Sequence, residues 1–447
     1  MRITHFSNSF ILVESGRERL VCDPWMGPAN GGGWQSFPEF PRDQLAKHLE
    51  GVQWVYISHL HDDHLDPHTL KTCGLLGAHF IIKRFATPTL RDRLKRLGVV
   101  HIHELDSFTP VSLGEFTVCI FPQMTSNSSD IEEDVNYDLD TSIAIKADGT
   151  VFFNQVDNPL SIPDLVKVHD WIASNMGPID VASLVSGAAS EYPHLFIGIS
   201  QEIEKKKIID RSLDDLVDWL RILRPRVYFP AGGTYLIPGF LSVFNDGIAQ
   251  PSFAQIERRV GLDVPAVKPI ALEGGQGIDL TGPSVERVLP PVVSPITTNL
   301  AQAISTHAAD HYWYESQPVP EIPELFRLLR MARENWRLQL GKLGIQTMQS
   351  ITFKIYMPLN IESAKPDVRS YVGDFLLQES SSEEVGELIV HIDARALMAC
   401  ITRRMVWNGT LGSLCLFERR PNRFFPNDTF SLNYLCLSHD QICEVSL

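Results

Sequence analysis

Five residues of the kinds that bind metals fall within positions 59–64, whose sequence is His-Leu-His-Asp-Asp-His. Neutral imidazoles and carboxylates are the ligands of divalent metals such as zinc and iron(II). In an extended loop, alternate residues point to the same side, so His59 and His61 can face one ion. Asp63 and His64 can then bind a second ion or orient the water of the first. The segment predicts a site for one or two divalent ions, zinc or iron.

The segments on either side of this motif indicate where it lies in a fold. Residues 54–58 are apolar and rich in β-forming side chains. Asp66 and Pro67 look like a helix N-cap followed by a proline in the first turn. The motif is thus expected between the end of a buried strand and the start of a helix, where α/β sheets place their ligands.

Two hairpins and several helices are predicted by local pattern. Residues 10–13 pair with 20–22, and residues 141–147 pair with 150–154 around Asp-Gly, which favours a type I′ turn. Helical periodicity marks residues 88–97, 213–223, 299–315, 324–340 and, near the end, 394–407. Strands are expected at 351–357, 371–377 and 386–392. In the helix at 324–340, the predicted buried positions are Leu325, Leu328, Leu329, Ala332, Trp336 and Leu340.

The length and composition indicate a globular protein of more than one domain. The chain has 447 residues, of which 44% are hydrophobic and 21% charged. We expect a catalytic domain at 1–283, a helical connector at 284–345 and a small α+β domain at 346–447. Acidic residues between 130 and 140 are expected to form a solvated loop.

The charge and the apolar runs exclude some classes of partner. The net charge of -15 argues against a nucleic-acid surface, which needs a basic face. No apolar run approaches the roughly 18 residues of a membrane span, and the start lacks the apolar core of a secretory signal. We therefore expect a cytoplasmic protein that acts on a small molecule, without a membrane or nucleic-acid partner; the oligomeric state is left open.

The motif at 59–64 resembles the His-x-His-x-Asp-His signature of the metallo-β-lactamase superfamily. The resemblance implies an α/β fold, the αβ/βα four-layer sandwich, in which one aspartate ends an early strand and a later one bridges two metals. Asp23, after Val-Cys, and Asp157, after Asn-Gln-Val, occupy these places. The expected metal ligands are His59, His61, Asp63, His64 and Asp157, with Asp23 beside them.

Two further histidines that the superfamily usually supplies are absent from this chain. The corresponding regions, 121–127 and 228–233, contain none. The amide oxygens of Gln123, Asn127 and Asn136 are weak substitutes, and we place Asn136 near the metal or the substrate. This difference leaves open whether one metal is bound or two.

A closer resemblance, over most of the chain, is to the metallo-β-lactamase half of the CMP-N-acetylneuraminate hydroxylase family. Segments 23–25, 135–141, 186–193, 228–233, 407–409 and 416–421 carry it. That family adds a Rieske iron-sulfur domain with Cys-x-His and Cys-x-x-His ligands, and we expect this domain to be absent here because the cysteines lack that spacing. Glu191 and His194, in or beside the segment at 186–193, would line the site.

Three functions remain open. The first is hydrolysis of an ester, phosphodiester or amide of a small, anionic substrate, in which Asp63 orients the metal-activated water or accepts its proton. The second is oxygenation by non-haem iron, because two histidines and a carboxylate leave positions open for O2 and substrate; electrons would then come from a separate reductase. The third is a degenerate scaffold without catalysis.

Overall fold

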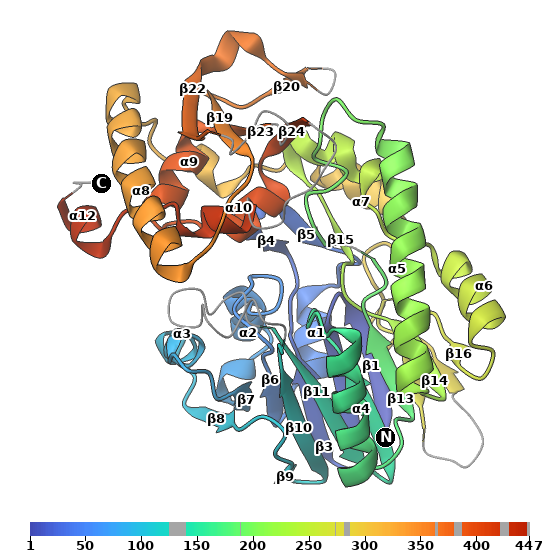
Figure 1. Cartoon of the computed structure of the whole chain (residues 1–447). Helices are drawn as coiled ribbons and strands as arrows, with labels where there is room; N and C mark the ends of the chain where they lie inside the picture. The colour runs from blue at the N-terminus through green and yellow to red at the C-terminus, as the bar shows by residue number, and fades with distance from the viewer. Residues whose placement is uncertain are drawn as a thin grey trace.

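A computed structural model describes residues 1–124, 140–187, 189–272, 274–280, 287–362, 365–379, 387–420 and 429–444. Two β-sheets pack face to face and helices cover their outer faces (Figure 1). The predicted αβ/βα four-layer sandwich with a C-terminal α+β part is therefore confirmed.

The first sheet holds the strand that leads into the metal motif. Its order, among the described residues, is β18-β17-β1-β2-β3-β6-β7-β8. β1 to β3 are antiparallel, and β3, β6, β7 and β8 run parallel. The strands are β1 Arg2–Ser7, β2 Phe10–Ser15, β3 Glu18–Cys22, β6 Trp54–Tyr56, β7 His79–Lys83, β8 His101–Leu105, β17 Gly277–Asp279 and β18 Arg287–Leu289.

The second sheet has the order β16-β14-β13-β12-β11-β10-β9 in the described part of the chain. Both predicted hairpins are confirmed, one as β2 with β3 and the other as β11 with β12. The strands are β9 Val111–Leu113, β10 Phe116–Pro122, β11 Thr141–Ala147, β12 Thr150–Asn154, β13 Val181–Leu184, β14 Val227–Pro230 and β16 Lys268–Pro269.

The alternation of side chains between the two faces of each strand explains why sheets and helices form layers. In β2, Ile11 and Val13 pack between the sheets, whereas Phe10 and Leu12 face the outer helices. Successive side chains of a strand point to opposite faces, so apolar residues at every position bury both faces of a sheet. The helices are α1 Arg42–Leu49, α2 Pro67–Thr72 and α3 Thr89–Arg96 on the first sheet, and α4 Ile162–Asn175, α5 Gln201–Leu223 and α6 Phe253–Asp263 on the second.

A smaller sheet and two helices connect the sandwich to the C-terminal part. The small sheet joins β15 to β5 and β5 to β4. Its strands are β4 Pro28–Ala29, β5 Trp34–Ser36 and β15 Tyr235–Leu236, and the helices that follow are α7 Leu300–His307 and α8 Ile322–Leu343. Short 3₁₀ helices lie at η1 Asn30–Gly32, η2 Leu75–Gly77, η4 Gly239–Gly247, η5 Trp313–Ser316, η6 Val368–Ser370 and η7 Ser431–Tyr434.

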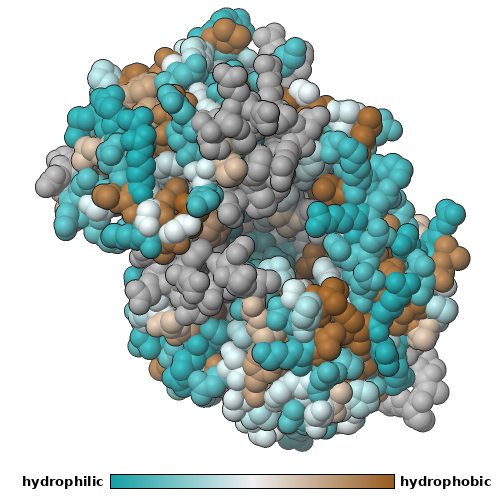
Figure 2. All heavy atoms as spheres, in the orientation of Figure 1, coloured by the Kyte–Doolittle hydropathy of each residue, from teal (hydrophilic) through white to brown (hydrophobic). Residues whose placement is uncertain are grey.

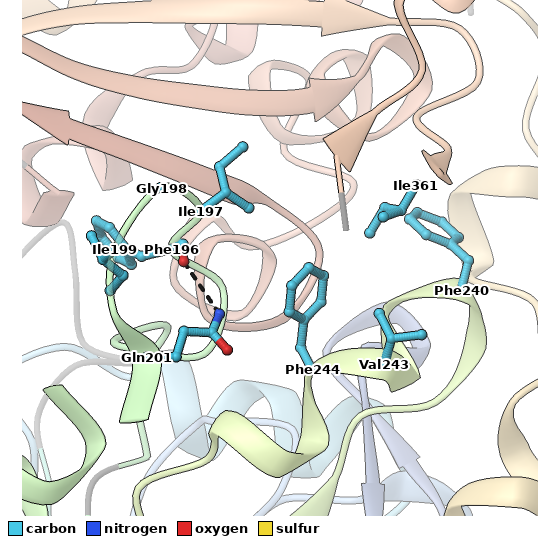
Figure 3. A pocket seen from close by; sticks show the side chains of 9 residues that line it. All are labelled: Phe196, Ile197, Gly198, Ile199, Gln201, Phe240, Val243, Phe244 and Ile361. Atoms are coloured by element: carbon cyan, nitrogen blue, oxygen red, sulfur yellow. Dashed lines mark hydrogen bonds between the residues drawn. The ribbon is translucent and has the colours of Figure 1, made fainter. Parts of the chain in front are cut away.

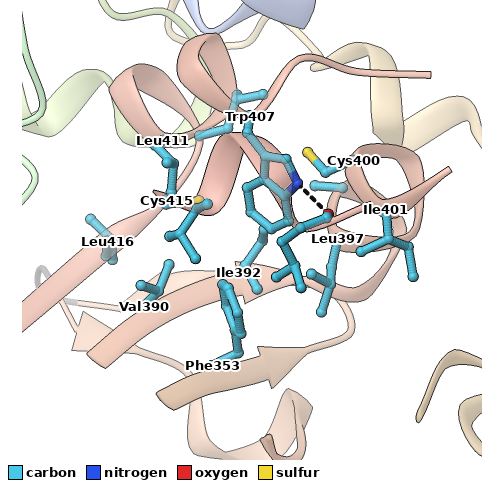
Figure 4. Packing of buried hydrophobic residues seen from close by; sticks show 14 of the residues in the cluster. Phe353, Val390, Ile392, Leu397, Cys400, Ile401, Trp407, Leu411, Cys415 and Leu416 are labelled. Atoms are coloured by element: carbon cyan, nitrogen blue, oxygen red, sulfur yellow. Dashed lines mark hydrogen bonds between the residues drawn. The ribbon is translucent and has the colours of Figure 1, made fainter. Parts of the chain in front are cut away.

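The C-terminal part is a sheet of order β22-β19-β23-β24 with helices packed on it. Its apolar core is shown in Figure 4, where Trp407, Leu411 and Phe353 come together. The elements are β19 Ser350–Tyr356, β20 Ile361–Glu362, β21 Lys365–Pro366, β22 Tyr371–Gln378, β23 Glu387–Asp393, α9 Ala394–Ile401, α10 Trp407–Ser413, β24 Leu416–Arg420 and α12 His439–Glu444.

We propose domains at 1–283, 284–345 and 346–447, and we call the last the C-terminal domain. Its core continues into the sandwich side, because Trp25, Trp34 and Tyr235 belong to the same buried cluster as Trp407. A bridge between Phe196 and Phe417 adds a backbone link. The C-terminal domain therefore packs directly on the loops that surround the metal motif.

Two predicted helices differ from the structure. The helix predicted at 299–315 ends at His307, because Tyr312 is extended and its buried hydroxyl donates to the Pro238 carbonyl at 2.7 Å. The helix predicted at 394–407 ends at Ile401, and a separate helix, α10, begins at Trp407. Arg403 adopts a left-handed φ of 60° between them, and its side chain donates to the Leu437 carbonyl. The chain therefore turns before Trp407.

Within the described residues, no helix is long and apolar enough to span a membrane.

Candidate metal centre

The loop between β6 and α2 presents the metal motif. It leaves β6 at Tyr56 and turns tightly, since the amides of His64 and Leu65 both donate to the His61 carbonyl. Asp66 then accepts hydrogen bonds from the amides of His68 and Thr69 and caps α2. The predicted N-cap and first-turn proline are confirmed, and they fix the end of the loop.

One group of possible ligands consists of His59, His61 and Asp140. Nε2 of His59 lies 2.8 Å from Nδ1 of His61 and 3.2 Å from Oδ1 of Asp140. The three ligand atoms lie within 4.8 Å of one another. Two imidazoles and one carboxylate thus converge on one point.

A second group consists of His59, His64 and Asp157, whose ligand atoms also lie within 4.8 Å of one another. Nε2 of His64 is 3.1 Å from Oδ2 of Asp157 and 3.3 Å from Oδ2 of Asp63. The structure therefore brings together all five of the predicted metal ligands. His59 takes part in both groups, so two ions bound here would lie close together.

In His59 and His64, the ring nitrogen that points away from the centre, Nδ1, has a hydrogen-bond partner in the protein. The Ser58 hydroxyl donates to Oδ2 of Asp23 at 2.6 Å, so Nδ1 of His59, 2.9 Å from the same hydroxyl, must donate to it. Nδ1 of His64 lies 3.0 Å from Oδ2 of Asp23. Asp23, as expected, stands beside the ligands, and it leaves Nε2 of each ring facing the centre. Converging lone pairs and carboxylates of this kind fit a cation.

The far nitrogen of His61 is held from the other end of the chain. Nε2 of His61 lies 2.9 Å from the side-chain amide of Asn408, in α10 of the C-terminal domain. These two residues are 347 positions apart in the sequence. Each of the three motif histidines thus has one ring nitrogen directed at the centre and the other at a fixed partner.

For Asp140, the last residue of the acidic stretch at 130–140, the expectation of a solvated loop is wrong. It lies just before β11, its side chain is only 14% exposed, and it faces His59. The Asp140 amide donates to Oε1 of Gln123 at 3.1 Å, so Gln123 positions the backbone there. Its place at the start of a strand beside the motif was the signal that could have identified it. Asn127 and Asn136 lie outside the described residues.

Asp157 follows β12 in a strained turn. Val156, the residue before it, has a φ of 55°, which a β-branched side chain rarely adopts. Strain of this kind costs about 1–3 kcal/mol and persists where the surroundings enforce it. Gly232 lies against this turn, and a Cβ at that position would come within 3.0 Å of Val185. The backbone after β14 therefore packs directly beside Asp157 and offers no side-chain ligand there.

Asn8, which sequence reasoning missed, connects three parts of the centre. Its side-chain amide donates to Oδ2 of Asp63 at 3.2 Å, and its Oδ1 accepts from the Gly233 amide at 2.7 Å. Its carbonyl also accepts from the Gly232 amide. The turn between β1 and β2 thus holds the motif and the glycine turn in one arrangement.

A cavity of about 450 Å³ opens onto these ligands. Trp34, stacked on Tyr235 at 4.3 Å, and Trp219 supply aromatic surface, and Glu191 supplies a carboxylate. Figure 2 shows the molecule hollowed between the sandwich and the C-terminal domain. The lining residues are Asn30, Trp34, His61, Asp63, Asp140, Gln155, Asp157, Asn158, Pro159, Val185, Gly187, Ala189, Ser190, Glu191, Trp219, Asn408, Gly409 and Gly412.

Burial and charge set the protonation of the metal-free centre. Burial lowers the pKa of His59 well below its usual value, so this imidazole is neutral and ready to bind. Burial alone would lower the pKa of His64, but the facing Asp63 and Asp157 carboxylates raise it well above its usual value. Burial raises the pKa of Asp23, against the opposing effect of His64. A metal that binds His64 must therefore displace a proton.

A second pocket, of about 610 Å³, lies where η4 faces the start of α5, and its lining is mainly apolar. Phe240, Val243 and Phe244 line one side, opposite Ile197 and Ile199, as Figure 3 shows. Gln201 bonds to the Phe196 carbonyl there. None of its lining residues belongs to the metal centre.

His194 does not line the cavity, although Glu191 does. Its side chain is buried, and neither ring nitrogen has a hydrogen-bond partner within the described part of the chain. Burial lowers the pKa of His194 to about 3. The folded protein therefore holds this imidazole in its neutral form.

Acid should destabilise the metal-free protein partly through His194. Because its folded pKa lies below the unfolded value of about 6.5, its contribution is complete above pH 6.5 and is lost as the pH falls toward 3. At pH 5 the loss is about 2 kcal/mol. Chemical unfolding at pH 7.5 and 5 should show a smaller fall in unfolding free energy for His194→Leu than for wild type. His68→Leu is the control, and an equal fall in all three proteins would contradict this assignment.

Residues 18–231 match the family model described as the beta-lactamase superfamily domain. Cytidine monophosphate-N-acetylneuraminic acid hydroxylase of Macaca mulatta is 28% identical over 251 residues, which are 53% of this chain and 38% of that protein. The inactive form of that hydroxylase in Homo sapiens is 29% identical over 250 residues, 53% of this chain and 45% of that protein. The chain thus spans less than half the length of these curated relatives.

Two solved structures are similar to this chain at lower identity. CmlA, a diiron beta-hydroxylase from Streptomyces venezuelae, is 16% identical with a TM-score of 0.40, covering 61% of this chain and 53% of that chain. An isothiocyanate hydrolase from Delia radicum gut bacteria is 13% identical with a TM-score of 0.43, covering 63% of this chain and 99% of that chain.

Proposed function

Since residues 18–231 match the model of the beta-lactamase superfamily domain, we propose that the chain is a metal-dependent enzyme that binds iron beside the cavity and hydroxylates a small substrate with O2. Two groups of residues would each hold one ion. His59, His61 and Asp140 hold the first ion. His64, Asp63 and Asp157 hold the second, with His59 at its edge.

The donor set is the observation that carries this proposal. The first group has two imidazoles and one carboxylate, and the carboxylate is Asp140. Sites with two histidines and one carboxylate are typical of non-haem iron(II) oxygenases and are shared by some catalytic zinc sites, whereas three imidazoles are typical of zinc. When bound in such a site, iron(II) supplies open coordination positions for O2 and substrate.

The protein's own residues orient the ligands and shape the space for substrate. Asp23 and Ser58 hold Nδ1 of His59 and His64, so Nε2 of each ring faces the centre; Nε2 of His59 carries a lone pair there, and Nε2 of His64 gains one when a metal displaces its proton. Trp34 and Trp219 border the cavity and exclude water from part of it. A substrate that enters must approach between these rings and the carboxylates.

The reaction needs an external reductant. Hydroxylation of a C–H bond by one O2 consumes two electrons and two protons and yields the alcohol and one water. We propose that a separate reductase delivers the electrons. The hydroxylase name of the Macaca mulatta relative supports the same reaction class.

The charge of the cavity bears on the substrate. Among the described lining residues there are four carboxylates, Asp63, Asp140, Asp157 and Glu191, and there is no lysine or arginine. A small anionic substrate would therefore be attracted by bound metal ions rather than by side chains. We propose that the affinity for such a substrate depends on metal.

Hydrolysis is the second candidate, because His59 joins both ligand groups. Two ions held so close can activate a water and stabilise both the attacking and the leaving oxygen of an ester or phosphodiester. Asp63 would then orient that water or accept its proton. Zinc, rather than iron, would be the expected metal.

Metal analysis together with O2 consumption tests the proposal. We expect protein purified from iron-supplemented cells to contain up to two iron ions per chain and to consume O2 when given a chemical reductant. His61→Ala should lose the first iron ion and O2 uptake, which controls for iron bound elsewhere. Zinc alone, with ester or phosphodiester turnover and no O2 uptake, would favour hydrolysis instead. Failure to bind either metal at micromolar concentration would favour a scaffold without catalysis.

A further inference from the structure

We propose that Asn408 of the C-terminal domain is a positioning residue of the metal centre, which holds the His61 ring in the orientation that directs Nδ1 at the first ion. The inference rests on the proposed metal site and goes beyond it, because it makes the C-terminal domain part of that site. Asn408 acts through its contact with His61.

The two nitrogens of His61 have different surroundings. Nδ1 lies 2.8 Å from Nε2 of His59, in the first ligand group, while Nε2 lies 2.9 Å from the Asn408 amide. A histidine that binds metal through one nitrogen carries a proton on the other, and this N–H needs an acceptor. The atom of Asn408 at 2.9 Å is its amide nitrogen, Nδ2, and a half turn of the amide about its last bond brings the amide oxygen to the same place as the acceptor.

The start of α10 is anchored so that Asn408 has little freedom. Trp407, just before it, is 3% exposed, and its indole N–H donates to the Leu435 carbonyl at 2.7 Å. Leu411, one turn later, packs into the core that Figure 4 shows around Trp407. Asn408 itself points away from this core, toward the loop that carries His61.

Glycines bring α10 into direct contact with the sandwich side. A Cβ on Gly409 would lie 2.4 Å from Oδ1 of Asn30, and a Cβ on Gly33 would lie 2.1 Å from Oγ of Ser413. Real Cβ atoms do not approach other atoms so closely. The helix and the loop at 30–33 therefore approach within a distance that only glycine allows, and this close packing fixes the reach of Asn408.

The contact between Asn408 and His61 is not explained by a role of Asn408 in forming α10. Val406 is the N-cap of α10, and no side-chain hydrogen bond caps this helix end. Asn408 lies inside the first turn, where asparagine is an unfavourable helix former. Its contact with His61 crosses from one domain to another, as a positioning contact does.

Cobalt(II) binding tests this assignment, with Asn408→Ala, Asn408→Asp and, as control, Asn335→Ala. Asn335 lies in α8 and bonds to the Cys436 carbonyl and to Gln441, remote from the centre. We expect Asn408→Ala to weaken the first cobalt site about 10- to 100-fold, the usual effect of removing such a partner. Asn408→Asp, which keeps an acceptor, and Asn335→Ala should bind as wild type does.

Proton NMR of the cobalt-loaded proteins gives an independent result. The ring N–H protons of metal-bound histidines are shifted far from the rest, and a hydrogen bond slows their exchange with water. Wild type and Asn408→Asp should show one such resonance that Asn408→Ala has lost. Equal cobalt affinity and an unchanged resonance in Asn408→Ala would overturn the positioning role. Failure of wild type to bind cobalt would instead refute the metal centre on which it rests.

Discussion

Replacing His59 with phenylalanine should abolish metal binding at both positions and reduce turnover to background. His59 is fully buried and belongs to both ligand groups, so its loss leaves the first ion with His61 and Asp140 alone and takes the shared imidazole from the second. Removing a partner that only orients a ligand costs about 10- to 100-fold in metal affinity, and removing a shared ligand should cost more. Metal content by elemental analysis, with turnover or O2 uptake, measures the effect.

Variants of a residue that belongs to only one ligand group are the matched comparison for His59→Phe. His61→Ala should affect the first ion alone, whereas Asp157→Ala should affect the second alone, because each residue belongs to only one group. His68→Ala, on the surface of α2, should keep both ions. Full metal content in His59→Phe, with an unchanged melting temperature, would show that the ions bind elsewhere.

Replacing Asp140 with histidine should change the preferred metal from iron to zinc and abolish O2 uptake. The variant would place three imidazoles in the first group, the ligand set of catalytic zinc sites. Asp140 lies at the cavity wall with its side chain 14% exposed, so a larger side chain can be accommodated. Anaerobic loading with equal amounts of iron(II) and zinc, followed by elemental analysis, gives the ratio directly.

Asp140→Asn separates charge from shape in this experiment. It keeps an oxygen at the same place but removes the negative charge, so it should weaken both metals without a gain for zinc. If Asp140→His takes up iron and zinc in the wild-type ratio and still consumes O2, the preference for iron does not arise from Asp140.

Much of the fold follows from local pattern. The six predicted buried residues of the helix at 324–340 are all buried in α8, since a helix that packs on one side repeats its apolar residues every three or four positions. The Asp-Gly turn set the register of β11 and β12, which places Asp157 after the second strand. Local sequence determines features of this kind.

Contacts between distant segments account for what sequence reasoning missed. Asp140 is one acidic residue among several, and only the approach of β11 to the motif distinguishes it. Asn408 lies just after the break between α9 and α10. At this break Arg403 has a left-handed backbone conformation, which the spacing of apolar residues does not predict. The metal-ligating roles of the motif, and those of Asp23, Glu191 and Asn136, stay predictions until the experiments above are done.

The contact between Asn408 and His61 also determines when, during protein synthesis, the centre can take its final geometry. Ribosomes add roughly 5–20 residues per second, so the 347 positions between the two residues correspond to roughly 20–70 s of synthesis. During that interval the motif at 59–64 has already emerged, while α10 does not yet exist. An ion captured early would meet a His61 ring that can still rotate, and the centre would reach its final geometry only after α10 has been made.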